Sequence, residues 1–448
     1  MPSTSRRRAL LGLVACCAGG SLSCTPSSST AETPAWGDAA PGLPTAGVGG
    51  LVVHEWGTLT TMEGSNGASL EGLQHETEAV PAFVHRNIDS YPSPFAHLGD
   101  SSRDATVRGA RSKMETPVIY FYSDTAQRVS VEVDFVRGLL THWYPRHASA
   151  SPEIEAARSG GVDLGGIGQS TLRWEVELVP PGQAPPREIP AVDADDAWQL
   201  ARETRAATLR TVPATGAGDA EAAPTEAEHY IFYRGLGQLE LPLQAVSGAG
   251  GQVIVMNHGT AEIAASFVLD MQGERGRYHR LGRIPAHGAQ PVAMGAQPSM
   301  PAAALVATLE RDMTAALVEQ GLFADEARAM VRTWSRAWFA SEGTRVLYVL
   351  PRDVVDRVLP LRIDPRPETL VRVLVGRHEY LTPEVEAEVE ALLRARVSAD
   401  ERAAAAAMGR LGRIGRFLEP SIRAVMARTA DPSVLRSARE VLAAFRAP

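Results

Sequence analysis

Short runs of alternating apolar and polar residues fill the chain from residue 51 to about residue 284, and this pattern constrains the fold more than any other feature. Alternating side chains on an extended backbone point to opposite faces, so one face of each run can be buried. Turn residues separate the runs at short, regular intervals. The pattern predicts an antiparallel β-sandwich-like domain over residues 51–295. One expected inward face consists of Val129, Val131, Val133 and Phe135, and another of Leu172, Trp174, Val176 and Leu178.

Individual elements of this region can be placed. Residues 118–122 and 128–135 are separated by a short turn-like stretch, which predicts a β-hairpin. A single helix is expected at 193–210, between a proline-rich loop and a loop rich in Gly, Ala and acidic residues. Further strands are expected at 171–178, 230–234, 238–243, 252–257, 262–271 and 278–284.

After residue 301 the apolar period becomes helical. We predict amphipathic helices at 302–320 and 324–340, then strands at 345–350 and 370–375 with a short helix near residue 353 between them. A further helix begins after Pro383, and residues 399 to 446 are helical and polar outside. The sequence therefore predicts an α+β, multidomain protein, with a mixed α/β domain at 296–398 and a helical C-terminal cap at 399–448. A Gly- and Pro-containing stretch near 290–300 is the expected linker.

Three consecutive Gly-Arg-apolar triplets occupy residues 409–417. Glycine inside a helix costs about 1 kcal/mol relative to alanine, so close packing or a local helix break must compensate. Their arginines form a solvated helix face or meet phosphate or lipid head groups, and the solvated face is the simpler interpretation.

The first 24 residues have a basic head, a short apolar run and small residues, which is typical of an export signal. The run is too short to span a membrane. Its Arg pair resembles a twin-arginine motif, and Cys16 and Cys24 each end a lipobox-like stretch. We expect a lipid anchor on one of them, followed by a disordered tether at 25–50; the alternative is an unlipidated secreted protein.

Charge and residue usage exclude some functions. All three cysteines lie in the first 24 residues, which leaves the mature protein no thiol for a disulfide, a zinc site or a nucleophile. The net charge of −8 becomes −11 when Arg6, Arg7 and Arg8 are removed with the signal, because residues 1–23 contain no acid. Such an acidic body argues against nucleic acid as a partner. Lys113 is the only lysine among 44 basic residues; either a compact, titratable ammonium is wanted at this position or its survival is chance.

The known catalytic motifs are missing from the sequence. His-Glu pairs occur at residues 54, 75 and 378, but the second histidine of an HExxH zinc protease is absent each time. No nucleophile elbow, Walker loop or dinucleotide fingerprint is present.

A distributed set of polar residues remains as the candidate site. Imidazoles and carboxylates without thiolates suit Zn, Fe or Mn, and such an ion activates water. Lys113 and Glu115 share one face of an extended strand, so they can pair or act as electrophile and base. The competing interpretation is that these residues satisfy buried backbone groups around core aromatics such as Trp56. The candidates are His54, His75 and Glu76 as metal ligands, and Lys113, Glu115 and Glu55 as catalytic groups.

The segments HEWGTLT, GLQHETE, KMETPVIYFY, THWYP, YIFYRGLG, RVLYVLPRDVVDRVLPL and RVLVGRHEYLTPE together resemble a group of exported, uncharacterised bacterial envelope proteins that carry an HEWGT motif. The similarity spans most of residues 51 to 385. Leu59 replaces the aromatic residue expected in that group. The group has no assigned activity, so the resemblance implies an envelope location and no functional residue.

Two functions follow as hypotheses. The first is a lipid-anchored binding or structural scaffold of the envelope, whose partner is a protein or an envelope polymer. The second is a metal-dependent envelope hydrolase that uses the His and Glu residues of the candidate site. The twin-arginine signal favours the hydrolase, since this route exports proteins already folded around cofactors, whereas the lack of a complete motif favours the scaffold.

Overall fold

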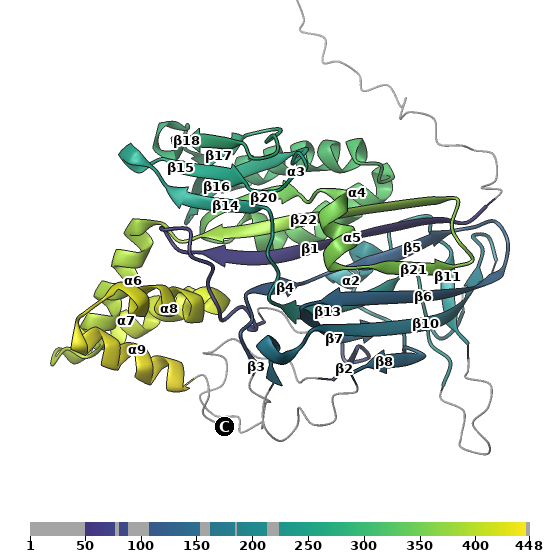
Figure 1. Ribbon diagram of the computed structural model, residues 1–448, viewed down its shortest axis with the longest axis horizontal. Coiled ribbons are helices and arrows are strands. Elements are labelled where there is room, and N and C mark those ends of the chain that lie inside the picture. The colour runs from purple at the N-terminus through teal and green to yellow at the C-terminus, as the bar shows by residue number, and fades with distance from the viewer. Residues whose placement is uncertain are drawn as a thin grey trace, which may run out of the picture. The chain divides into compact units, whose positions relative to one another are not determined.

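The structure is a computed structural model that describes residues 50–76, 80–87, 107–152, 162–183, 186–212 and 224–444 (Figure 1). The chain divides into two compact units, residues 1–46 and 47–448, and all described residues belong to the second. The export signal, Cys16, Cys24 and the tether lie outside the described residues. With 30% helix and 36% strand, the α+β class and the C-terminal helices are confirmed.

The largest sheet in the described part of the chain has eleven strands and is centred on β1 (Val52–Glu63). All of β1 pairs in parallel with β22 (Thr369–Tyr380), and the two strands run side by side in Figure 1. The expected domain boundary near residue 295 therefore falls inside one sheet. Listed across the sheet, the strands are β19 (Met300–Pro301), β17 (Arg275–Arg280), β16 (Ser266–Gln272), β20 (Gly343–Val349), β22, β1, β4 (Ser112–Met114), β13 (Ile231–Gly237), β7 (Gly138–Tyr144) and β2 (His85–Arg86), with β5 (Val118–Tyr122) against β1 and β13.

Three smaller sheets accompany it in the described residues. The first has six strands, β12 (Ala227–Glu228), β11 (Thr208–Thr211), β10 (Gln169–Val179), β6 (Gln127–Val136) and β21 (Leu361–Asp364), with β8 (Ser149–Ser151) against β10. The second is β14 (Leu243–Ser247), β15 (Val253–Asn257) and β18 (Ala289–Val292), and the third is β3 (Val107–Arg108) with β9 (Val162–Asp163).

The predicted hairpin is wrong, although both of its strands exist. β5 belongs to the eleven-stranded sheet and β6 to the six-stranded sheet, so the turn between them carries the chain from one sheet to the other. Every residue of β5 is buried, which requires a strand covered on both faces. β6 instead alternates, and its inward face is fully buried, as expected, in the core shared with the eleven-stranded sheet.

The two faces of the eleven-stranded sheet have different coverings. One face shares an apolar core with β6, β10 and β14–β15, which contribute residues such as Val131, Trp174 and Val255. The other face is covered by α3 (Ala302–Glu319) and α4 (Ala324–Trp334), whose buried side chains include Leu309 and Met330. α4 continues as a π-helical turn, Ser335–Phe339. Each side of β1 is therefore buried in a different environment.

The expected helix at 193–210 is wrong. Only α2 (Ala197–Ala201) forms, capped by Asp196, and β11 begins at Thr208. The backbone N–H of Ala207 donates to the carbonyl of Phe121, so this segment extends along the strand layer instead of continuing as a helix.

The C-terminal helices have an apolar core of their own, which includes Leu393, Leu411 and Ile422. They are grouped at the yellow end of the chain in Figure 1. Among the described residues, no helix is long and apolar enough to cross a membrane. The remaining helices are α5 (Arg352–Val358), α6 (Pro383–Arg396), α7 (Glu401–Arg413), α8 (Leu418–Arg428) and α9 (Pro432–Ala444), with short 3-10 turns at Leu164–Gly166, Ala249–Gly251, Met294–Ala296 and Gly415–Phe417.

Candidate functional site

The pleat of β1 separates the residues of the HEWGT motif. His54 and Trp56 lie on the face covered by α3 and α4, whereas Glu55 lies on the face shared with Tyr233. Because neighbouring residues of a strand point to opposite faces, His54 and Glu55 cannot serve one site. The expected convergence of His54, Glu55, His75, Glu76 and Glu115 is therefore not found.

His54 fixes the start of α4. Its Nδ1 lies 2.7 Å from Glu326 Oε2, and Tyr122 donates to the other carboxylate oxygen of Glu326 at 2.7 Å. The same glutamate accepts the backbone N–H of Phe323 at 2.8 Å, which satisfies a free donor at the helix N-terminus. His54 and Glu326 are fully buried. This arrangement is a structural clamp between strand and helix.

Glu55 belongs to a closed ion network on the opposite face. Arg372 Nε donates to Glu55 at 2.5 Å, while its two Nη atoms donate to Asp356 and to the carbonyl of Leu359 at 2.8 and 2.7 Å. The hydroxyl of Tyr233 donates to the second oxygen of Glu55. Every group of this network has a partner, so the catalytic role expected of Glu55 has no reactive geometry to support it.

Trp56 and Gly57 complete the motif as packing residues. Trp56 is 1% exposed and its ring meets Trp334 edge-on, at 6.5 Å between centroids. A Cβ on Gly57 would lie 2.7 Å from the Cα of Pro117, closer than real contacts allow, so only glycine fits. The motif is thus explained by strand packing.

A second group of charges lies further along β1, on the His54 face. Thr60 of β1 is opposite Arg377 of β22 and opposite Lys113 of β4, so the sheet register brings these three residues into one row. We call the surrounding group the charge cluster. It consists of Glu76, Lys113, Glu115, Arg234, Arg345, Arg377, Glu379 and Arg416.

Lys113 connects the charge cluster to His75 and Glu76, which precede β4 in the chain. Its ammonium donates to the carbonyl of His75 at 2.7 Å and pairs with Glu76 at 2.7 Å, and Arg234 approaches the same Glu76 oxygen at 3.2 Å. Burial lowers the pKa of Lys113, because the charged ammonium loses solvation. Burial opposes ionisation of Glu76, but Arg234 and Lys113 outweigh it and lower its pKa.

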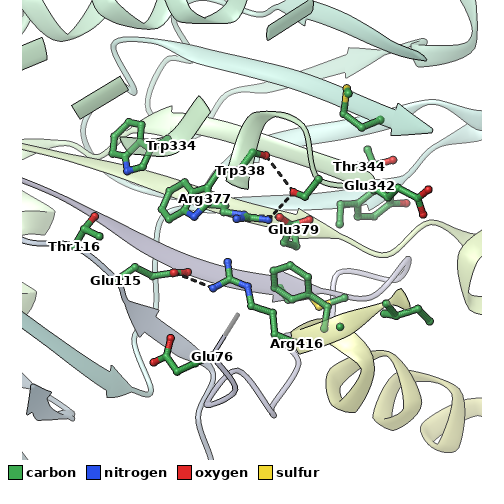
Figure 2. Close-up of a pocket in the computed structure, with 18 of the residues that line it drawn as sticks. Glu76, Glu115, Thr116, Trp334, Trp338, Glu342, Thr344, Arg377, Glu379 and Arg416 are labelled. Atoms are coloured by element: carbon green, nitrogen blue, oxygen red, sulfur yellow. Dashed lines mark hydrogen bonds and ion pairs between the residues drawn. The ribbon is translucent and has the colours of Figure 1, made fainter. Parts of the chain in front are cut away.

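Arg416, from the C-terminal helical region, keeps Glu115 ionised as a carboxylate. One oxygen accepts from Thr60 at 2.5 Å. The other pairs with Arg416 Nη1 at 2.8 Å, as Figure 2 shows. Burial opposes ionisation, but Arg416 and then Lys113 outweigh it and hold the pKa of Glu115 well below its usual range. A carboxylate with such a low pKa is a weak general base at neutral pH, which argues against the role of base expected for it.

Arg377 and Glu379 extend the cluster across β22. Arg377 Nε pairs with Glu379 at 2.6 Å, and Arg345 Nε pairs with the same oxygen at 3.0 Å. The guanidinium of Arg377 lies between two rings, 5.0 Å from the centre of Trp338 and 5.3 Å from that of Phe417. Burial lowers the pKa of Arg377 to about 10, so it is still charged at neutral pH. The Arg377–Glu379 ion pair is thus buried at the end of β22.

The third Gly-Arg triplet delivers Arg416 to the cluster. Gly415 has φ +63°, a left-handed conformation that glycine adopts without strain, and it ends the helical run begun by α7. The expected local break is therefore confirmed, but the solvated face is wrong for Arg416, which is 8% exposed. Its Nη2 has no hydrogen-bond partner among the described residues.

A cavity of about 1310 Å³ opens beside the cluster. Arg234, Arg377 and Arg416 line it together with Glu76, Glu115 and Glu379, while Lys113 and Arg345 lie behind this lining. The indole rings of Trp334 and Trp338 stack at 5.3 Å with an interplanar angle of 2°. In Figure 2 Trp334 lies above Glu115, and Trp338 lies beside Arg377. The cavity thus combines an aromatic wall with a charged end. Further lining residues are Trp56, Tyr230, Phe232 and Phe417.

The proposed metal ligands fall into separate environments. His75 Nε2 lies 2.8 Å from Glu419 of α8, whereas His54 pairs with Glu326 of α4. The two histidines thus have different partners on different helices. Burial opposes ionisation of Glu419, but the hydrogen bond from His75 outweighs it and lowers its pKa to about 2. Among the described residues, no group of three or more His, Cys, Asp or Glu is arranged to hold a metal ion. These residues do not fit a Zn, Fe or Mn site.

The structure thus brings together Glu76, Lys113 and Glu115, three of the six candidates. The predicted site omitted Arg234, Arg377 and Arg416, because arginine is frequent throughout the sequence. Arg416 was considered only within the Gly-Arg triplets, where a solvated helix face was the preferred interpretation. The helix-breaking glycines before Arg416 were the available signal.

Comparisons with known proteins add little. No protein-family model and no curated protein matches the chain. Among solved structures, the yeast delta-COP-I mu-homology domain complexed with a WxWxV peptide is 7% identical, with 74% of this chain and 98% of that chain covered and a TM-score of 0.24. A chaperone-tip adhesin complex of CFA/I fimbriae biogenesis is 9% identical, with 42% and 90% covered and a TM-score of 0.11. TM-scores this low indicate neither fold nor function.

Proposed function

We propose that this protein is a lipid-anchored binding protein of the cell envelope, whose β-rich, sandwich-like body holds a small molecule in the cavity beside the charge cluster. The observation that carries the proposal is the cavity itself, which is larger than the roughly 300–1,000 Å³ of ordinary ligand sites and so has room for a small molecule, and which has an aromatic wall and convergent polar groups.

The same geometry disfavours a hydrolase. Glu76, Glu115 and Glu379 are each held as carboxylates by neighbouring cations, so none is poised to donate a proton. The described cavity lining contains no histidine or cysteine to act as a base or nucleophile. Carboxylates that are held in ion pairs with neighbouring cations are better suited to binding than to proton transfer.

Binding is testable with N-phenyl-1-naphthylamine, a neutral fluorophore that brightens in apolar surroundings. We expect saturable binding of one probe per chain, with quenching of tryptophan emission because Trp334 and Trp338 line the cavity. Thr116→Phe should weaken it, since Thr116 is a partly exposed lining residue and a phenyl ring at this position occupies part of the cavity. Equal binding by this variant, or no saturable binding by the wild type, would contradict the proposal.

The location in the cell rests on the N-terminal sequence and on the resemblance to exported envelope proteins. A lipoprotein cysteine carries several acyl chains, which anchor stably where a single chain binds only marginally. Membrane fractionation should find the full chain in the membrane and the Cys16→Ser, Cys24→Ser double variant in the soluble fraction. The same distribution for both would end the lipid-anchor proposal and leave the cavity proposal intact.

A further inference from the structure

The described residues of the charge cluster carry more positive than negative charge. Its cations are Lys113, Arg234, Arg345, Arg377 and Arg416, and its carboxylates are Glu76, Glu115 and Glu379, so five cations face three anions. If Lys113 is neutral, because burial lowers its pKa, four cations still face three carboxylates. Uncompensated buried charge is expensive, and proteins rarely keep it without a partner.

The excess charge has a definite position. Arg416 pairs through Nη1 with Glu115, but its Nη2 is buried and has no hydrogen-bond partner in the described part of the chain. Arg416 lines the cavity, and its guanidinium lies 4.8 Å from the centre of the Phe417 ring. Arg377 lines the same end of the cavity, and its Nη2 has only a 3.2 Å contact with Ser341. Two arginines that line the cavity thus carry a weakly used or unused donor each.

The neighbouring wall favours a flat apolar group. Trp334 and Trp338 are stacked and buried, and both line the cavity. Aromatic rings prefer offset-stacked or edge-to-face contacts with other rings. A planar apolar body against these indoles would keep water from the guanidinium groups and so strengthen their interaction with an anion.

From this arrangement we infer that the ligand is an aromatic carboxylate or a similar organic monoanion, whose anionic group accepts from Arg416 Nη2 and Arg377 and whose ring packs against Trp338. This inference rests on the proposed binding function and adds the chemical class of the ligand. It assigns Arg416 as the residue that selects an anion over a neutral analogue.

Two probes of the same shape separate the inference from the proposed function. They are 2-naphthoate and 2-naphthamide, which differ in charge and not in ring system. Calorimetric titration of the purified full chain should show naphthoate binding at least about tenfold more tightly, as expected for hydrogen bonds to a charged group in a partly buried site. Inorganic phosphate alone should bind far more weakly than naphthoate, because it lacks the ring.

The variant test removes the unused donor without leaving Glu115 unpaired. In the double variant Arg416→Gln, Glu115→Gln, the two probes should bind with similar affinity, and binding of the amide should be retained. Arg410→Gln is the matched control, since Arg410 also follows a triplet glycine and lines the cavity but is paired with both Glu388 and Glu342. It should keep the preference for naphthoate.

The outcomes are distinct. If the wild type binds the carboxylate and the amide equally, the anion inference is overturned and the binding function stands. If the double variant keeps the full preference, Arg416 is not the selecting residue and the inference is likewise overturned. If the wild type binds neither probe, the inference and the proposed cavity both fail.

Discussion

Two buried ion networks lie on opposite faces of β1, and they differ in how completely their donors are used. On one face, all three nitrogen positions of Arg372 have acceptors, and no residue of this Glu55 network lines the cavity. On the other face, Arg416 is almost as deeply buried and lines the cavity, yet its Nη2 has no hydrogen-bond partner among the residues that the structure describes. A closed network fixes the fold, whereas an open one beside a cavity is available to a ligand.

The largest effect is expected when Arg372 is removed from the fully paired Glu55 network. Arg372→Gln leaves the Glu55 carboxylate buried with only the Tyr233 hydroxyl, so we expect a loss of about 3 to 5 kcal/mol in the free energy of unfolding. Urea unfolding followed by tryptophan fluorescence measures it. The double variant Arg372→Met, Glu55→Gln should recover much of the loss, and a single variant as stable as the wild type would contradict the structural role.

Acid titration tests the contact between His75 of the β-rich body and Glu419 of the C-terminal helices. The pKa of Glu419 falls from 4.5 to about 2 on folding, so the unfolded state binds more protons in this range. The contribution of Glu419 to the free energy of unfolding is complete above pH 4.5 and is lost as the pH falls toward 2. It amounts to at most about 3 kcal/mol, because each unit of pKa corresponds to ~1.4 kcal/mol.

Stability measured between pH 4.5 and 3 should therefore fall less steeply in Glu419→Gln than in the wild type. Glu240→Gln is the control, because the Glu240 side chain is 86% exposed. Identical slopes for the wild type and Glu419→Gln would show that the His75 contact does not stabilise the carboxylate.

A smaller effect is expected at His54. His54→Ala removes one of three hydrogen bonds to Glu326 and leaves the others, so we expect a loss of about 2 kcal/mol. Thermal unfolding with and without EDTA distinguishes the structural interpretation of His54 from the metal-binding one. A chelator that lowers the stability of the wild type but not of His54→Ala would restore the metal hypothesis.

The sequence predicted what depends on local periodicity and missed what depends on distant partners. The inward face of β6 and the shared face of Lys113 and Glu115 follow from the two-residue period, and both are found. The same period already implied that His54 and Glu55 diverge, a conclusion that adjacency in the motif obscured.

Long-range choices were not visible in the sequence. β5 contacts β1 and β13 instead of β6, since only the folded protein supplies the covers that a strand buried on both faces needs. Arg416 is 301 residues away from Glu115, and no spacing rule connects them. A cavity between such segments becomes evident only when the sheet and the C-terminal helices are placed together.

The most direct test is the gain in unfolding free energy produced by saturating 2-naphthoate in three proteins. A ligand that binds only the folded state stabilises by RT ln(1 + [L]/Kd), about 2.7 kcal/mol at one hundred times Kd. The account predicts the same gain for the wild type and for the less stable Arg372→Gln, and a much smaller gain for Arg416→Gln, Glu115→Gln. An equal gain in all three would contradict the claim that the open network, and not the closed one, binds the ligand.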